Sequence, residues 1–239
     1  MTTFRKIIPI FYGHYYAKIP SQFQDIGKKW IKDVDDTAYP VMVKVLGFSP
    51  QIDKYIVEFI SDPSKPAGYY DGIRIVDNIE GGHIVLKTDL LQTEACKPYP
   101  RNLEGALVYE TIHGFLQPLK FRSQWSQPTV LNIDESFDII FEAELDFRLG
   151  LDEFAESLYP TYSSQPSRYG YFGVLWDIRD KFGWAPFQKF FKMLNESSSP
   201  LAIDDSTLCY YLGRCIGADV ATYFIKHGFD INVSRNDFS

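Results

Sequence analysis

Three residues whose side chains could bind a metal or transfer a proton, Tyr109, Glu110 and His113, lie close together near the middle of the chain. They belong to the run Tyr109-Glu110-Thr111-Ile112-His113. An imidazole is a common metal ligand, and a carboxylate can accept or donate a proton. On a helix, residues three or four apart share a face, which would set Tyr109 and Glu110 beside His113. The same run also fits an ordinary helix with one exposed acid and one hydrogen-bonded histidine.

A helix must carry this group, and the sequence predicts one from 102 to about 115. Its apolar residues Val108, Ile112, Phe115 and Leu119 recur at helical spacing and form one stripe. Upstream, a helix is expected over 21–35. Strands are expected at 6–16, 41–46, 54–61, 73–76 and 83–87, with a loop at 62–68 and a turn at Gly81-Gly82.

Downstream of 102 the pattern predicts mainly helices. These are expected at 134–149, at 168–181 with Gly183 as its end, from Pro186 onward, and from a Ser206 cap to Gly228. The resulting fold class is α+β, with a β-rich lobe over 1–101 and a helical lobe over 102–239.

The amino-acid composition and net charge exclude some classes of binding partner. The 239 residues are 45% hydrophobic and 23% charged, with a net charge of −7 and a pI near 5.1. No basic stretch is available to neutralise phosphates, so neither a nucleic acid nor an anionic membrane is expected as a partner. No apolar run is long enough to predict a membrane span.

The cysteines and the amino-terminal residues indicate the cellular compartment in which the protein is expected. Cys96, Cys209 and Cys215 are odd in number and lack the spacing of paired metal ligands, which favours free thiols in a reducing compartment. Residues 1–19 contain no small-residue cleavage site. A cytoplasmic location is therefore favoured, and a secreted one follows only if a leader has been removed. Asn195 and Asn232 begin glycosylation acceptor tripeptides, a pattern that is common by chance.

Residues 70 to 232 together resemble the gluzincin zinc metallopeptidases, of the peptidase MA-like and basic-secretory-protein-like groups. In that family the corresponding helix reads His-Glu-x-x-His. The two histidines bind zinc and the glutamate activates a bound water. A third ligand, a glutamate, comes from a second helix downstream. Here the segment 128–138 resembles the family's Pro-x-Trp-x-x-Glu-Gly-x-Ala-Asp segment. Glu135, followed by Ser136, best matches the ligand, and Asp134, with Asp138 four residues later, is the rival.

The resemblance extends to further segments. Residues 169–191 resemble the two helices that follow the ligand helix in the family, and 209–229 resemble its closing helix. Gly81-Gly82-His83 resembles the edge strand that lines the substrate cleft. Tyr171 is the candidate oxyanion donor, and the other interpretation of this residue is a core aromatic. His83 has two interpretations. It is either a metal ligand or a solvated histidine at the end of a strand.

The chain departs from the family where Tyr109 stands in place of the first histidine. A phenol binds metal well only after losing its proton, and its ordinary pKa is about 10. The resemblance therefore predicts a pseudoenzyme, with zinc bound weakly by His113 and Glu135 or not at all. The alternatives are an active metal-dependent hydrolase with altered ligands and a non-enzymatic module. In each case the expected partner is a peptide or protein in the cleft.

Overall fold

The computed structural model describes residues 6–62, 64–92, 99–100, 102–119, 128–197 and 204–231. Contacts divide the chain into two units, and each is described by itself. The first unit comprises 1–44 and 49–115, and the second comprises 45–48 and 116–239. The fold is mixed α+β, because the first unit contains a five-stranded sheet and the described residues of the second contain helices without strands.

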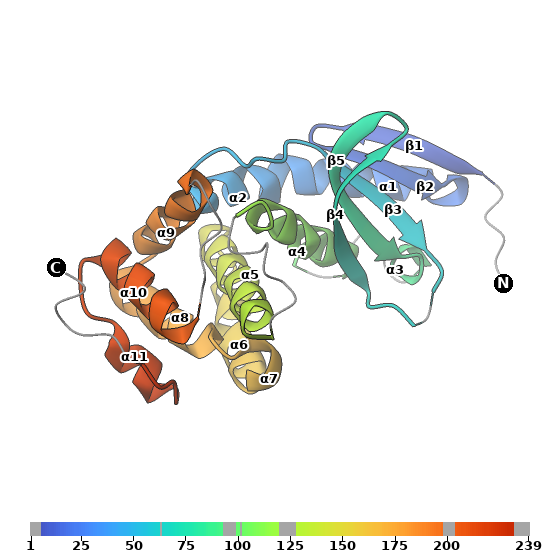
Figure 1. Cartoon of the computed structure of the whole chain (residues 1–239). Helices are drawn as coiled ribbons and strands as arrows, with labels where there is room; N and C mark the ends of the chain where they lie inside the picture. Colours follow the sequence, from blue (N-terminus) through green and yellow to red (C-terminus); the bar gives the residue numbers. More distant parts are fainter. Residues whose placement is uncertain are drawn as a thin grey trace. The chain divides into compact units, whose positions relative to one another are not determined.

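The sheet of the first unit has the strand order β1-β2-β3-β5-β4 (Figure 1). Two antiparallel hairpins, β1–β2 and β4–β5, flank β3, which runs parallel to both β2 and β5. The strands are β1 Ile7–Tyr12, β2 Tyr15–Pro20, β3 Tyr55–Ile60, β4 Gly68–Val76 and β5 Ile79–Lys87.

The sheet differs from the predicted strands at two turns, and the residues at each turn explain the difference. The single strand predicted over 6–16 is a hairpin that turns at Gly13, with φ of 50°. The turn predicted at Gly81-Gly82 was wrong, because both glycines lie inside β5. The chain turns instead at Asp77-Asn78, where both residues have positive φ, 51° and 65°. Asp and Asn tolerate this conformation, so they serve as the hairpin turn.

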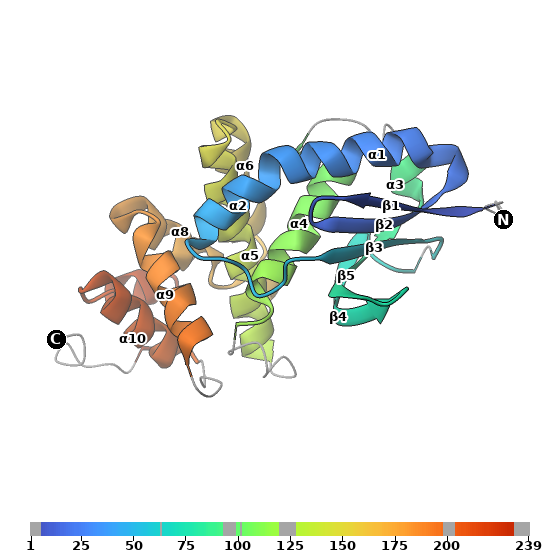
Figure 2. The same cartoon turned by 90° about the horizontal axis from the view of Figure 1, so that it is seen from above.

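The helices of the first unit lie in the chain between β2 and β3 and after β5. The strand predicted over 41–46 was wrong, because the valines at alternate positions lie on a helix. The residues fully buried there are Met42, Val45 and Leu46, at helical rather than strand spacing. Figure 2 shows this helix continuing from α1 as one long segment. The helices are α1 Gln24–Asp33, a π-helical turn Val34–Ala38, α2 Tyr39–Leu46, α3 Asp89–Gln92 and α4 Asn102–Leu116.

The second unit consists of α5 Pro128–Arg148, α6 Asp152–Ser163, α7 Pro166–Tyr169, α8 Phe172–Phe182, α9 Ala185–Glu196, α10 Asp205–Ile216 and α11 Ala221–Lys226. Of the predicted helices, α9 begins at Ala185, one residue before the predicted Pro186, whereas α6 was not predicted. The helix expected over 168–181 is interrupted between α7 and α8. The closing helix is also divided, because Gly217 ends α10 with φ of 77°. Asp204, not Ser206, caps α10 in a reciprocal capping box with Thr207.

Aromatic packing forms the core of the second unit. The rings of Phe137 and Phe190 stack at 5.3 Å, and those of Trp184 and Phe187 stack at 4.8 Å. The Trp184 indole N–H donates to the carbonyl of Val45 at 2.6 Å. A buried indole thus keeps a hydrogen bond, which its burial requires.

Candidate functional site

Helix α4 carries the three residues singled out in the sequence, and its predicted helical state is confirmed. Gly114 lets the helix approach the sheet closely, because a Cβ there would lie 2.4 Å from Cε1 of Tyr55 on β3. Thr111 faces β2, where its hydroxyl lies 3.0 Å from that of Tyr15. The division between the two units falls after Phe115 rather than at the expected boundary of 101 and 102, since α4 packs with the sheet.

Tyr109 and His113 lie side by side on α4. Their ring centroids are 4.7 Å apart and their planes meet at 81°, an edge-to-face contact. His113 is buried and Tyr109 is half-buried. The i, i+4 relationship predicted from the sequence therefore brings the phenol against the imidazole.

Glu110 is buried on the same helix, with 5% of its surface exposed. Its carboxylate lies against the first residue of β4, because a Cβ on Gly68 would be 3.0 Å from Oε1. The space beside this carboxylate therefore exists because position 68 has no side chain. Helix α4 and strand β4 form one local site in the first unit.

Strand β4, not β5, is the edge strand. The prediction that Gly81-Gly82-His83 would lie at the edge was wrong, because β5 runs between β3 and β4. The His83 imidazole lies across the sheet between two carboxylates. Its Nε2 is 3.0 Å from Glu58 on β3, and its Nδ1 is 3.3 Å from Asp71 on β4. The imidazole on β5 therefore links the edge strand β4 to β3 through contacts with a carboxylate on each strand.

The two candidate downstream acids lie on α5 and differ in their surroundings. Both oxygens of Glu135 accept hydrogen bonds from Nη2 of Arg168, at 3.2 and 3.1 Å. Asp134, in contrast, is 1% exposed. Arg168 thus already neutralises the acid that the sequence favours as a zinc ligand.

Asp134 belongs to a row of acids on α5 that lie buried. Asp134, Asp138, Glu142 and Asp146 occur at four-residue steps on α5, and each is less than 9% exposed. Residues four apart share a helix face, so the row forms one acidic stripe. The i, i+4 repetition of acids was visible in the sequence, but acids at that spacing more commonly face solvent.

Tyr171, the candidate oxyanion donor, is a buried residue of the second unit. Its hydroxyl donates to Asp205, its backbone N–H donates to Oγ of Ser136 at 3.2 Å, and its ring stacks on Phe229 at 4.7 Å. Burial, together with the Asp205 carboxylate, raises the pKa of Tyr171 well above its usual value. The phenol is therefore a neutral donor whose observed acceptor is a carboxylate.

The remaining histidines have carboxylate partners. Nδ1 of His14 lies 2.7 Å from Asp35, and its ring stacks on Tyr39 at 3.7 Å. Nε2 of His227 lies 2.8 Å from Asp177. Both contacts are of the kind that fixes an imidazole within a folded chain.

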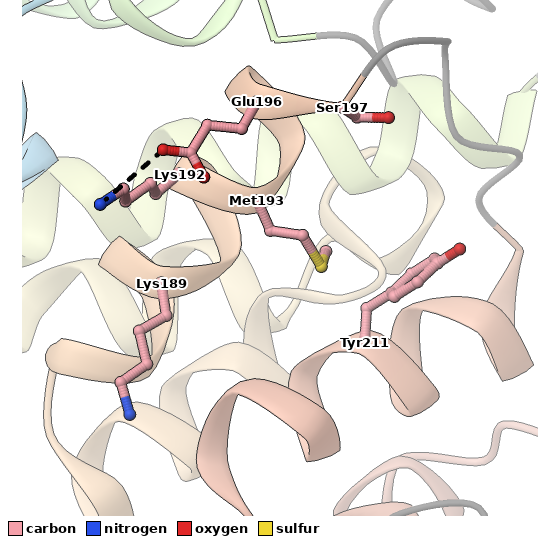
Figure 3. Close-up of a pocket in the computed structure, with 6 residues that line it drawn as sticks. All are labelled: Lys189, Lys192, Met193, Glu196, Ser197 and Tyr211. Atoms are coloured by element: carbon pink, nitrogen blue, oxygen red, sulfur yellow. Dashed lines mark ion pairs between the residues drawn. The ribbon is translucent and has the colours of Figure 1, made fainter.

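A pocket in the second unit lies between α9 and α10 (Figure 3). Lys192 and Glu196 form an ion pair of 3.7 Å on its rim. The lining combines two lysines and one glutamate with a serine, a methionine and a phenol. The pocket therefore presents no cluster of groups suited to catalysis. It is lined by Lys189, Lys192, Met193, Glu196, Ser197 and Tyr211.

The donor chemistry does not fit a three-ligand zinc site. Such a site uses imidazole, thiolate or carboxylate ligands, and here a phenol stands one turn from His113. Glu135, the matched third ligand, is engaged by a guanidinium. Among the described residues, no group of three or more His, Cys, Asp or Glu side chains is arranged to hold a metal ion.

Comparison of the chain with protein-family models, with curated proteins and with solved structures finds no match. Within the described residues, no helix combines the length and the apolar character needed to cross a bilayer.

Proposed function

We propose that this chain is a metallopeptidase-like protein that has lost hydrolytic activity and acts by binding a peptide or protein. The contact between Tyr109 and His113 supports this proposal, because the family resemblance expects an imidazole ligand at the position where this phenol lies against His113. A phenol that keeps its proton is a poor zinc ligand. Glu110 would then have no metal-bound water to activate.

A zincin-like fold is supported by the order of elements in the first unit. A five-stranded mixed sheet precedes α4, and its edge strand β4 runs antiparallel to β5. The carboxylate of Glu110 lies against this edge strand at Gly68. An extended peptide could add to a sheet edge through main-chain hydrogen bonds, which makes binding without cleavage physically reasonable.

Zinc content and peptidase activity test the proposal directly. The protein would be purified without chelators, and its metal content measured by mass spectrometry. Casein and peptide cleavage would be followed with and without a chelator. We expect far less than one zinc per chain and no chelator-sensitive cleavage. One zinc per chain together with chelator-sensitive cleavage would establish the alternative, an active hydrolase with altered ligands.

Restoring the missing ligand tests the assignment of α4. We expect Tyr109→His to strengthen zinc binding at least about tenfold in calorimetry, because two imidazoles four residues apart can reach one metal. Tyr109→Phe is the matched control and should show no gain, since it preserves the ring and removes the oxygen. If Tyr109→His gains no affinity, these positions are not a former metal site.

The same background distinguishes the two downstream acids. The variant that removes the ligand abolishes the gain of Tyr109→His, and the other variant leaves that gain intact. Loss in Glu135→Gln assigns the ligand to Glu135, and loss in Asp134→Asn assigns it to Asp134. If Glu135 is the ligand, Arg168→Gln should strengthen zinc binding further, since it releases that carboxylate.

A further inference from the structure

The outer edge of β4 is open to pairing with another chain. It is the last strand of the sheet, and in the described part of the chain no strand pairs with its outer side. Two of its apolar side chains are exposed, Ile73 by 51% and Ile75 by 71%. Such an edge offers main-chain donors and acceptors together with apolar surface.

The opposite edge of the sheet is protected, which makes β4 distinctive. Strand β1 contains Pro9 near its middle. Proline has no backbone N–H and cannot take part fully in a new ladder. Strand β4 is nine residues long and contains no proline. Of the two edges, β4 is therefore the one without proline, and its own irregularity is the bulge between Tyr70 and Ile73.

The register of β4 against β5 defines which side chains share a face. A bulge separates Tyr70, opposite Ile84, from Ile73, opposite Gly82. Tyr70 and Ile73 thus share one face, because residues two apart on β5 point to the same side. Asp71, which contacts His83, and Arg74, which pairs with Gly81, lie on the other face.

This sequence is self-complementary. An antiparallel copy of β4, centred between Gly72 and Ile73, sets Asp71 opposite Arg74 of the second copy. By symmetry the same pair forms twice. Tyr70 then faces Ile75, and both belong to the apolar face of the strand. Within one chain Arg74 already lies 3.3 Å from Asp71, so this register replaces the exposed ion pair inside each chain with two ion pairs between the chains.

We propose that the protein forms a two-fold symmetric dimer by antiparallel pairing of β4 with β4 of a second copy, which extends the sheet across both chains. A two-fold interface uses the same surface on both subunits, so self-complementary charge is the property it requires. The inference rests on β4 alone and holds whether or not α4 binds zinc. A dimer formed in this way occupies the edge that the proposed function offers to a peptide, so a second copy and a peptide would compete for it.

Charge reversal tests the dimer. Sedimentation over a concentration series would be measured for the full chain, for Asp71→Arg and for Arg74→Asp. Each reversal turns two attractive pairs into two repulsive ones, so each variant alone should dimerise about tenfold or more weakly. An equimolar mixture of the two variants should recover dimerisation, because position 71 of each chain again faces an opposite charge at position 74. A full chain that stays monomeric at every concentration overturns the proposal, as does a mixture that fails to recover.

Replacing an exposed apolar side chain of β4 tests the dimer independently of the charge reversals. Ile75→Lys should also weaken dimerisation, because it places a charge opposite Tyr70 of the second copy. Ile225→Lys is the matched control, since Ile225 is 57% exposed and lies on α11. Equal loss in both variants, or no loss in Ile75→Lys, would contradict an interface at β4. Circular dichroism shows whether each variant retains its fold.

Discussion

The hydroxyl of Tyr15 on β2 lies 3.0 Å from Oγ1 of Thr111 on α4 and joins the motif helix to the sheet. Thr111 donates its own proton to the carbonyl of Leu107 at 2.7 Å, so Tyr15 is the donor in the shared contact. The neighbouring Tyr55 ring is 5.6 Å away, centroid to centroid. Its buried hydroxyl has no hydrogen-bond partner among the described residues.

These two tyrosines should respond oppositely to loss of the hydroxyl. Tyr15→Phe should lower the free energy of unfolding by about 1 kcal/mol, because it removes a buried hydrogen bond. Tyr55→Phe should raise it by up to about 1 kcal/mol, because it removes a buried polar atom without a partner. Urea denaturation of both variants measures the difference. A comparable loss in Tyr55→Phe would mean that its hydroxyl has a partner.

Gly114→Ala tests the close approach of α4 to the sheet. In an open helix this change would stabilise by up to about 1 kcal/mol. Here the added methyl would meet Tyr55, which is fully buried, so we expect a net loss of about 1 to 3 kcal/mol. Ala106→Gly in the same helix reports the propensity effect by itself. Stabilisation by Gly114→Ala would show that the helix can shift away from β3.

Asp177 should contribute to stability in a pH-dependent way. Burial acts to raise its pKa, but hydrogen bonds from Lys226 and His227 outweigh that effect and hold the pKa of Asp177 below its usual value. A carboxyl with a lowered folded pKa stabilises above its unfolded pKa, and the contribution is lost as pH falls through the folded value.

Asp177→Asn should therefore cost about 1 kcal/mol at neutral pH and progressively less below about pH 4. Thermal unfolding of both proteins across this range measures the effect. A difference that stays constant with pH would show that the carboxylate charge is not the cause.

Arg179 should not be replaceable by lysine. Its Nε and Nη2 both contact one oxygen of Glu144, at 3.0 and 2.8 Å, and its guanidinium lies 4.1 Å from the ring centroid of Phe147. Lysine lacks the planar group that makes both interactions, so Arg179→Lys should cost about 1 to 2 kcal/mol. Arg148→Lys is the control, because Arg148 is more exposed and should lose less than about 0.5 kcal/mol. Equal losses would argue against a role for the stacked guanidinium.

Local pattern was sufficient for much of the secondary structure. The helix over 102–116 was predicted because its apolar residues recur at helical spacing, and the strand over 55–60 because it is a short run rich in β-branched and aromatic residues. The valines of 41–46 misled the prediction, since β-branched residues favour strands only when packing allows it. At Gly81-Gly82, glycine meets a tertiary need, because Tyr55 and Tyr70 lie over position 82.

The sequence by itself determined that Tyr109, Glu110 and His113 share one helix, because their spacing and the helical period set that relationship. It could not determine that β4 is the edge strand or that Glu110 lies against Gly68, since strand order depends on contacts between distant segments. Nor could it show that Arg168 engages Glu135, because the two residues meet only when α5 and α7 pack together. Spacing along the chain fixes a shared helix face, whereas only folding decides which residues that face meets.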